Sequence, residues 1–87
     1  GKVATKIGEK MKKTASKKQV ICITHLPQVA ALADYHYYIE KKSTDDETIT
    51  SIYLLDSNQK IIEIAKMLSG ETMTQEAIAN AKKLLDA

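Results

Sequence analysis

One histidine of this sequence occupies a position that favours chemistry. His25 follows Thr24 at the end of a short apolar run, residues 20–23, and Pro27 comes two residues later. This pattern predicts a buried strand that ends at Thr24 and a helix that begins near Pro27. In α/β folds, groups at the carboxyl ends of such strands contact ligands. An imidazole there can donate a hydrogen bond to a developing negative oxygen, as on a phosphate, so His25 is the candidate catalytic and ligand-binding residue. The other interpretation is that His25 only caps a strand.

Two stretches imitate nucleotide-binding motifs and are set aside. Gly1 and Lys2 resemble the end of a phosphate-binding loop, but Val3 stands where that loop needs Ser or Thr. Residues 52–56 resemble an apolar strand that ends in a magnesium-binding Asp, but Ser57 occupies the place of the usual catalytic Glu. A strand that ends at a polar turn explains this second stretch better. We therefore predict no metal site.

The composition is that of an ordinary globular protein. The 87 residues are 44% hydrophobic and 28% charged, and the core must be aliphatic with some Tyr because Trp and Phe are absent. The net charge of +2 is too small to indicate nucleic-acid binding by itself. Cys22 is the single cysteine and lies in the apolar run, so we expect a buried, reduced thiol. There is no run of membrane-spanning length and no signal peptide, and we expect a cytoplasmic protein with no membrane partner.

Apolar periodicity and turn residues define the expected elements. In chain order they are a helix at 2–16, a strand at 19–24, a helix at 27–34, strands at 35–42 and 48–55 that form a hairpin, a helix that ends at Gly70, and a last helix capped by Thr72 or Thr74. His36 is expected in the second strand. The order α-β-α-β-β-α-α implies a parallel pair between the first two strands, joined by a right-handed crossover. A parallel pair with one uncovered face is not stable alone, so the chain is expected to be part of a larger α/β domain.

The first helix is rich in lysine on its polar faces, at positions 2, 6, 10, 12 and 13. Such a helix can contact phosphates, but a solvated charged face is the more common meaning of this pattern. A nucleic-acid-binding module would have no arginine and no aromatic stacking platform to support it.

The residues around His25 resemble a known pattern. A strand that ends in Thr-His, a short helix that ends in Ala33-Asp34 and a following apolar strand resemble the H-loop region of ABC-type ATPases. Residues 22–34 and 39–41 are similar, more specifically, to the C-terminal portion of the RecN family of bacterial DNA repair proteins, which are SMC-like members of the ABC ATPase superfamily. The similarity extends through residues 61–70 and covers essentially the whole chain.

This resemblance implies that residues 1–87 are the C-terminal part of a P-loop (ABC-type) ATPase head. The phosphate-binding loop, the signature motif and the magnesium-binding acidic pair would lie upstream, and Gly1 would end the D-loop. His25 would be the H-loop histidine, which hydrogen-bonds the γ-phosphate. ATP and Mg are implied for the full-length parent, and no cofactor or activity is expected for the isolated chain. The implied partners are the remainder of the head, a second head in a homodimer, and DNA through the full-length protein.

A second reading belongs to a different class of protein. The same pattern is compatible with a small non-catalytic α/β interaction or regulatory domain, and the coding sequence upstream of residue 1 would separate the two. In either case we expect the Thr24 side chain to bond backbone at the strand end, and Gln28 to lie in the first turn of its helix.

Overall fold

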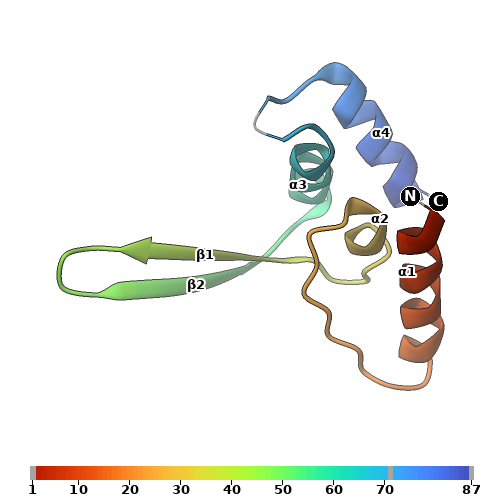
Figure 1. Ribbon diagram of the computed structural model, residues 1–87, viewed down its shortest axis with the longest axis horizontal. Coiled ribbons are helices and arrows are strands. Elements are labelled where there is room, and N and C mark those ends of the chain that lie inside the picture. The colour runs from red at the N-terminus through yellow and green to blue at the C-terminus, as the bar shows by residue number, and fades with distance from the viewer. Residues whose placement is uncertain (1, 71, 87) are drawn as a thin grey trace.

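The computed structural model describes residues 2–70 and 72–86, so the interpretations of Gly1 lie outside the described residues. The described residues form four helices and two strands, which follow one another as Figure 1 shows. They are α1 (Lys2–Ala15), α2 (Pro27–Ala30), β1 (Tyr37–Ser43), β2 (Thr48–Leu54), α3 (Ser57–Ser69) and α4 (Gln75–Asp86). The helices form one body, from which the two strands project as an arm (Figure 1).

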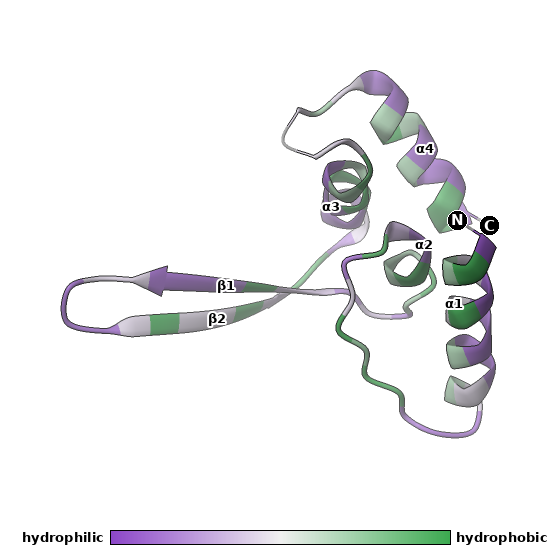
Figure 2. Ribbon diagram, in the orientation of Figure 1, coloured by the Kyte–Doolittle hydropathy of each residue, from purple (hydrophilic) through white to green (hydrophobic). Residues whose placement is uncertain are grey.

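A small aliphatic core joins α2, α3 and α4. Its buried residues are mostly alanines around one large side chain, Ile64, which is fully buried. They are Ala30, Ala31, Ile64, Ala65, Ala77 and Ala81. Apolar faces of α3 and α4 meet in Figure 2, because isoleucines, leucines and alanines recur at helical spacing on both. The small residues let the two helices approach closely.

Local signals mark both ends of α3 and the start of α4. Asp56 caps α3 in a capping box: its Oδ1 accepts from the Gln59 amide at 2.8 Å, and the Gln59 side chain accepts from the Asp56 amide at 3.0 Å. Gly70 ends the helix with φ of 75°, a conformation that disfavours other residues. Of the two predicted caps of α4, Thr74 is confirmed, because its Oγ1 accepts from the Ala77 amide at 3.0 Å.

The predicted hairpin is confirmed. β1 and β2 pair antiparallel, with Tyr37 opposite Leu54 and Ser43 opposite Thr48. The polar turn closes with a hydrogen bond from the Thr44 amide to the Glu47 carbonyl at 2.7 Å. The sheet has these two strands only, in the part of the chain that the structure describes. Since neither face is covered, its apolar side chains remain largely exposed, as Ile52 does at 64%.

The predicted strand at 19–24 is not formed in this structure. These residues form an extended connection between α1 and α2 without strand pairing, so the described residues contain no parallel pair. Ile21 and Ile23 are 85% and 90% exposed, and Cys22, expected to be buried, is exposed too. The physical reason is that a strand needs a neighbour to satisfy its backbone groups, and β1 pairs with β2 alone. The observed order is therefore α-α-β-β-α-α, still a mixture of helix and strand.

Candidate functional site

A tight local turn fixes the backbone at His25. The Thr24 hydroxyl accepts a hydrogen bond from the Leu26 amide at 3.0 Å, spanning His25. The predicted backbone-bonding role of Thr24 is thereby confirmed. Leu26 is extended and precedes Pro27 at the start of α2, and its carbonyl accepts from the amides of Val29 and Ala30. His25 is thus held between a side-chain turn on one side and a helix start on the other.

The short helix α2 anchors this turn to the body of the protein. Val29, Ala30 and Ala31 are each only 8% exposed, and Ala30 and Ala31 belong to the core around Ile64. The predicted helix over 27–34 is shorter than expected, because after Ala30 the chain continues in tight turns toward β1. Gln28 lies in the first turn of α2, as predicted.

The side chain of His25 is exposed and has no hydrogen-bond partner among the described residues. Its ring N–H is free to donate to an anionic ligand from a backbone that is already in place. Two open hollows lie on the described surface, and His25 lines neither of them. Gln28 lines one of them, together with Lys2, Thr5 and Lys6 of α1. The chain therefore presents one donor, without a built pocket around it.

No cluster of three or more His, Cys, Asp or Glu side chains that could hold a metal occurs within residues 2–70 and 72–86. None of the described helices is long and apolar enough to cross a membrane.

Two lysines hold residues 32–34, the segment that follows α2. These contacts were not predicted from the sequence. Lys12 of α1 donates to the Leu32 carbonyl at 3.1 Å and pairs with the Asp34 carboxylate at 3.2 Å. Lys60 of α3 donates to the Asp34 carbonyl at 3.4 Å. Asp34 thus connects α1 with α3, although more than 20 residues separate it from either lysine. No local sequence signal encodes such contacts.

His36 lies just before β1 rather than inside it, so the expectation of a strand residue is off by one position. Its carbonyl accepts from the Leu55 amide at 2.9 Å, and its ring is half-buried. The ring Nδ1 is buried with no hydrogen-bond partner among the described residues.

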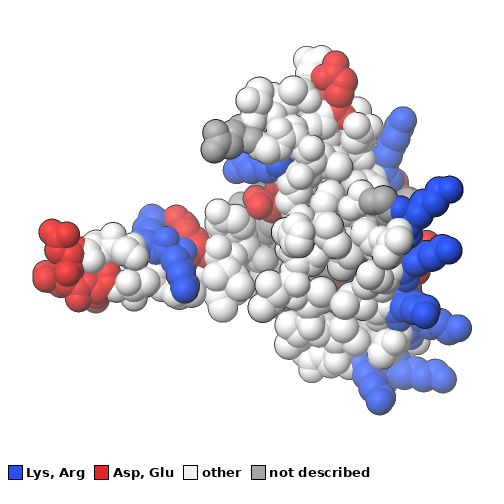
Figure 3. All heavy atoms as spheres, viewed as in Figure 1, with Lys and Arg blue, Asp and Glu red and all other residues white. Residues whose placement is uncertain are grey.

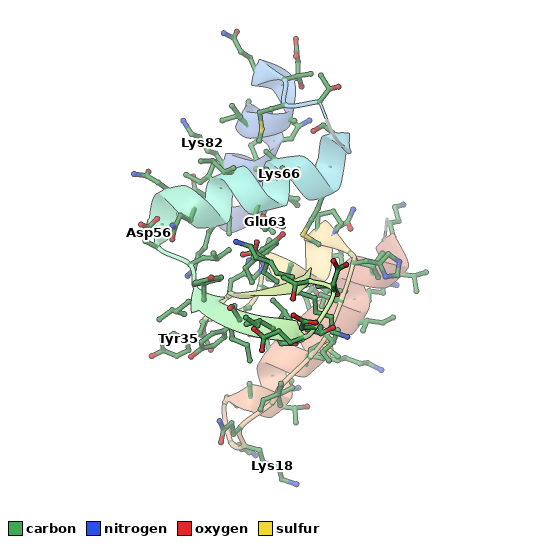
Figure 4. All side chains as sticks on the ribbon, turned by 90° about the vertical axis from the view of Figure 1, so that its left-hand side faces the viewer. Lys18, Tyr35, Asp56, Glu63, Lys66 and Lys82 are labelled. Carbon is green, nitrogen blue, oxygen red and sulfur yellow. The ribbon has the colours of Figure 1, made fainter. Side chains whose placement is uncertain are left out.

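Burial lowers the pKa of His36 from its ordinary value of 6.5; Glu63 opposes this and Lys60 adds to it. Glu63 lies on the side of α3 that faces the strands (Figure 4). The neutral ring that results is a structural neighbour of α3, and the sequence offered no sign of this role.

Comparison with known proteins finds close relatives over the whole chain. The chain is 45% identical over 86 residues to DNA repair protein RecN of Halalkalibacterium halodurans, covering 99% of this chain and 15% of that protein. It is 46% identical over 85 residues to the RecN of Bacillus subtilis, with 98% and 15% covered. It is 38% identical over 87 residues to the RecN of Vibrio cholerae, with 100% and 16% covered. No family model matches the chain.

The fold class is a mixed helix-and-strand segment with a two-stranded antiparallel sheet. The chain belongs to the RecN family and corresponds to the C-terminal portion of its members, of whose length it spans about 15%. The resemblance predicted from the residues around His25 is confirmed.

Proposed function

We propose that this chain is the C-terminal part of the ATPase head of a RecN-like protein that acts in DNA double-strand break repair and recombination in the cytoplasm. The observation that supports this most strongly is the identity of 38–46% over nearly the whole chain with proteins named DNA repair protein RecN. Cys22, an exposed free thiol, fits a reducing compartment.

His25 is the H-loop histidine in this proposal and donates to the γ-phosphate of ATP. The side chain of His25 is exposed and its backbone is held by the Thr24 turn. Both features are compatible with binding a ligand whose other contacts come from outside this chain. A donor that needs no rearrangement is effective at the moment negative charge develops on the phosphoryl oxygens. ATP with Mg supplies the transferable phosphoryl group when bound. The phosphate cradle and the metal ligands come from the remainder of the head, since the described residues offer neither.

The exposed run at 20–23 is the second support. Four apolar residues with high strand propensity lie in an extended segment that ends at the His25 turn. In the complete head this segment pairs as a strand of a larger parallel sheet, and the rest of the head covers it. Burying one isoleucine side chain contributes about 1.5–3 kcal/mol, so covering Ile21 and Ile23 would stabilise the head considerably. A second head completes the ATP site in a homodimer.

The test is the ATPase rate of the full-length protein with His25→Ala. We expect the rate to fall on the order of 10²–10³, the effect of removing one transition-state donor. His25→Gln, which keeps an N–H donor, should retain more activity than His25→Ala. His36→Gln is the matched control, since His36 lies at the base of the hairpin, and its rate should stay near that of the wild type. Normal turnover by His25→Ala at normal protein levels would reduce His25 to a structural cap.

A further inference from the structure

The solvent face of α1 carries a regular row of lysines. We call Lys2, Lys6, Lys10, Lys13 and Lys17 the lysine stripe; all five are exposed. At 3.6 residues per turn they fall within an arc of about 80°. This arc lies opposite Ala4 and Gly8, the buried positions that hold α1 against the body. The stripe continues past the end of α1, because the Lys17 amide still donates to the Thr14 carbonyl at 3.1 Å.

The lysines of the stripe are not used to hold the fold together. The two ion pairs among the described residues are Lys12–Asp34 and Lys42–Glu40, and neither involves the stripe. Lys12 lies on a different flank of α1, toward α2. The one carboxylate on α1 is Glu9, beside the stripe. Figure 3 shows lysine side chains fanning outward along the side of the molecule on which α1 lies. Among the described residues the stripe therefore forms no ion pair, and its lysines remain an exposed cationic surface.

We propose that the lysine stripe binds the sugar–phosphate backbone of duplex DNA. From Lys2 to Lys17 it is about 22 Å long at a rise of about 1.5 Å per residue. One strand of duplex DNA presents a phosphate about every 3.4 Å of helix axis, so a stripe of this length faces several phosphates. Four ammonium groups on α1, with that of Lys17 just past its end, can therefore contact successive phosphates of the duplex.

The residue types on the stripe decide which form of DNA is bound and how. Lysine is a point charge that contacts phosphate without the planar fork with which arginine reads guanine, so binding should not depend on sequence. The stripe has no aromatic side chain on which unpaired bases could stack. The tyrosines Tyr37, Tyr38 and Tyr53 lie on the hairpin, which projects away from α1 (Figure 1). These features favour duplex over single-stranded DNA.

The inference rests on the proposed role of the parent protein in DNA repair and assigns the DNA contact to a particular surface. The test compares two triple variants of the full-length protein. The stripe variant carries Lys6→Gln, Lys10→Gln and Lys13→Gln. The control variant carries Lys66→Gln, Lys82→Gln and Lys83→Gln, which remove the same charge from exposed positions of α3 and α4. Glutamine and lysine have similar helix propensity, and circular dichroism should show unchanged folding of both variants.

Binding of two labelled duplexes of unrelated sequence is measured by fluorescence anisotropy over a series of KCl concentrations. The slope of log K against log salt becomes less steep by about 0.9 for each lost phosphate contact. The slope of the stripe variant should therefore be less steep than that of the wild type by about 2.7, and equally so for both duplexes. The control variant should keep the wild-type slope. An unchanged slope in the stripe variant, or an equal loss in the control, would overturn the inference.

The ATPase rate without DNA separates this inference from the proposed function. The stripe variant should keep that rate, and His25→Ala should keep the wild-type salt slope. If His25→Ala hydrolyses ATP normally while the stripe variant loses its slope, the proposed role of His25 fails and the DNA surface stands. If the slope persists while His25→Ala is inactive, the DNA surface fails alone.

Discussion

Gly8 of α1 and Leu32 beyond α2 lie so close that even a Cβ at Gly8 would displace the end of the Leu32 side chain. A Cβ atom there would lie 2.7 Å from Cδ1 of Leu32 and 3.4 Å from the Cα of Val29. The missing side chain is what lets α1 pack on α2, and α2 in turn fixes the turn at His25. The glycine that lets α1 approach α2 thus lies 17 residues before the candidate histidine in the chain.

Substitutions at Gly8 should distinguish the effect of steric clash with Leu32 from the effect of helix propensity. Gly8→Leu should destabilise the chain by about 1–3 kcal/mol, because the added atoms push α1 away from α2. Gly8→Ala should change stability by less than about 1 kcal/mol, because the gain in helix propensity offsets a small displacement of the flexible Leu32 side chain. Urea unfolding followed by circular dichroism measures both. Equal stability of the two variants would show that α1 is not packed as described.

Stability should depend on pH through His36. Burial lowers the pKa of this residue below 6.5 in the folded chain. Below pH 6.5 His36 is therefore protonated in the unfolded chain while it is still largely neutral in the folded chain. The stabilising contribution is complete above pH 6.5, and it is lost as the pH falls from 6.5 toward the lower folded-state pKa. Urea unfolding at several pH values between 7.5 and 5.5 tests this. His36→Gln should flatten the profile, and an unchanged slope in that variant would assign the dependence to other groups.

The isolated chain should self-associate. The run at 20–23 is exposed, and both outer edges of the two-stranded sheet have unpaired backbone groups. Such edges pair readily with another copy. Light scattering over a concentration series should show a rising mean mass, and Ile21→Lys with Ile23→Lys should lower it. A wild-type chain that stays monomeric at all concentrations and melts cooperatively at high temperature would show that these surfaces need no cover.

Short-range signals predicted most of the fold. The cap at Asp56, the glycine at position 70 and the alternation along the hairpin are encoded within a few residues, and the structure follows them. The sequence of residues 19–24 shows a high strand propensity, but a strand forms only where a neighbouring strand pairs with it. The described residues offer no such neighbour, so propensity alone gave a strand where the structure has an extended connection. His25 was singled out from its place after the apolar run, and its role remains a prediction. The Asp34 contacts and the burial of His36 escaped prediction because they join residues far apart in sequence.

The central claim is that this chain completes an ATPase head by bringing His25 to it. The most direct test removes the corresponding segment from the full-length protein and supplies this chain separately by co-expression. We predict that the truncated protein alone hydrolyses no ATP, that the wild-type chain restores hydrolysis, and that the His25→Ala chain restores association without hydrolysis. Hydrolysis by the truncated protein alone, or equal rescue by the His25→Ala chain, would contradict the claim.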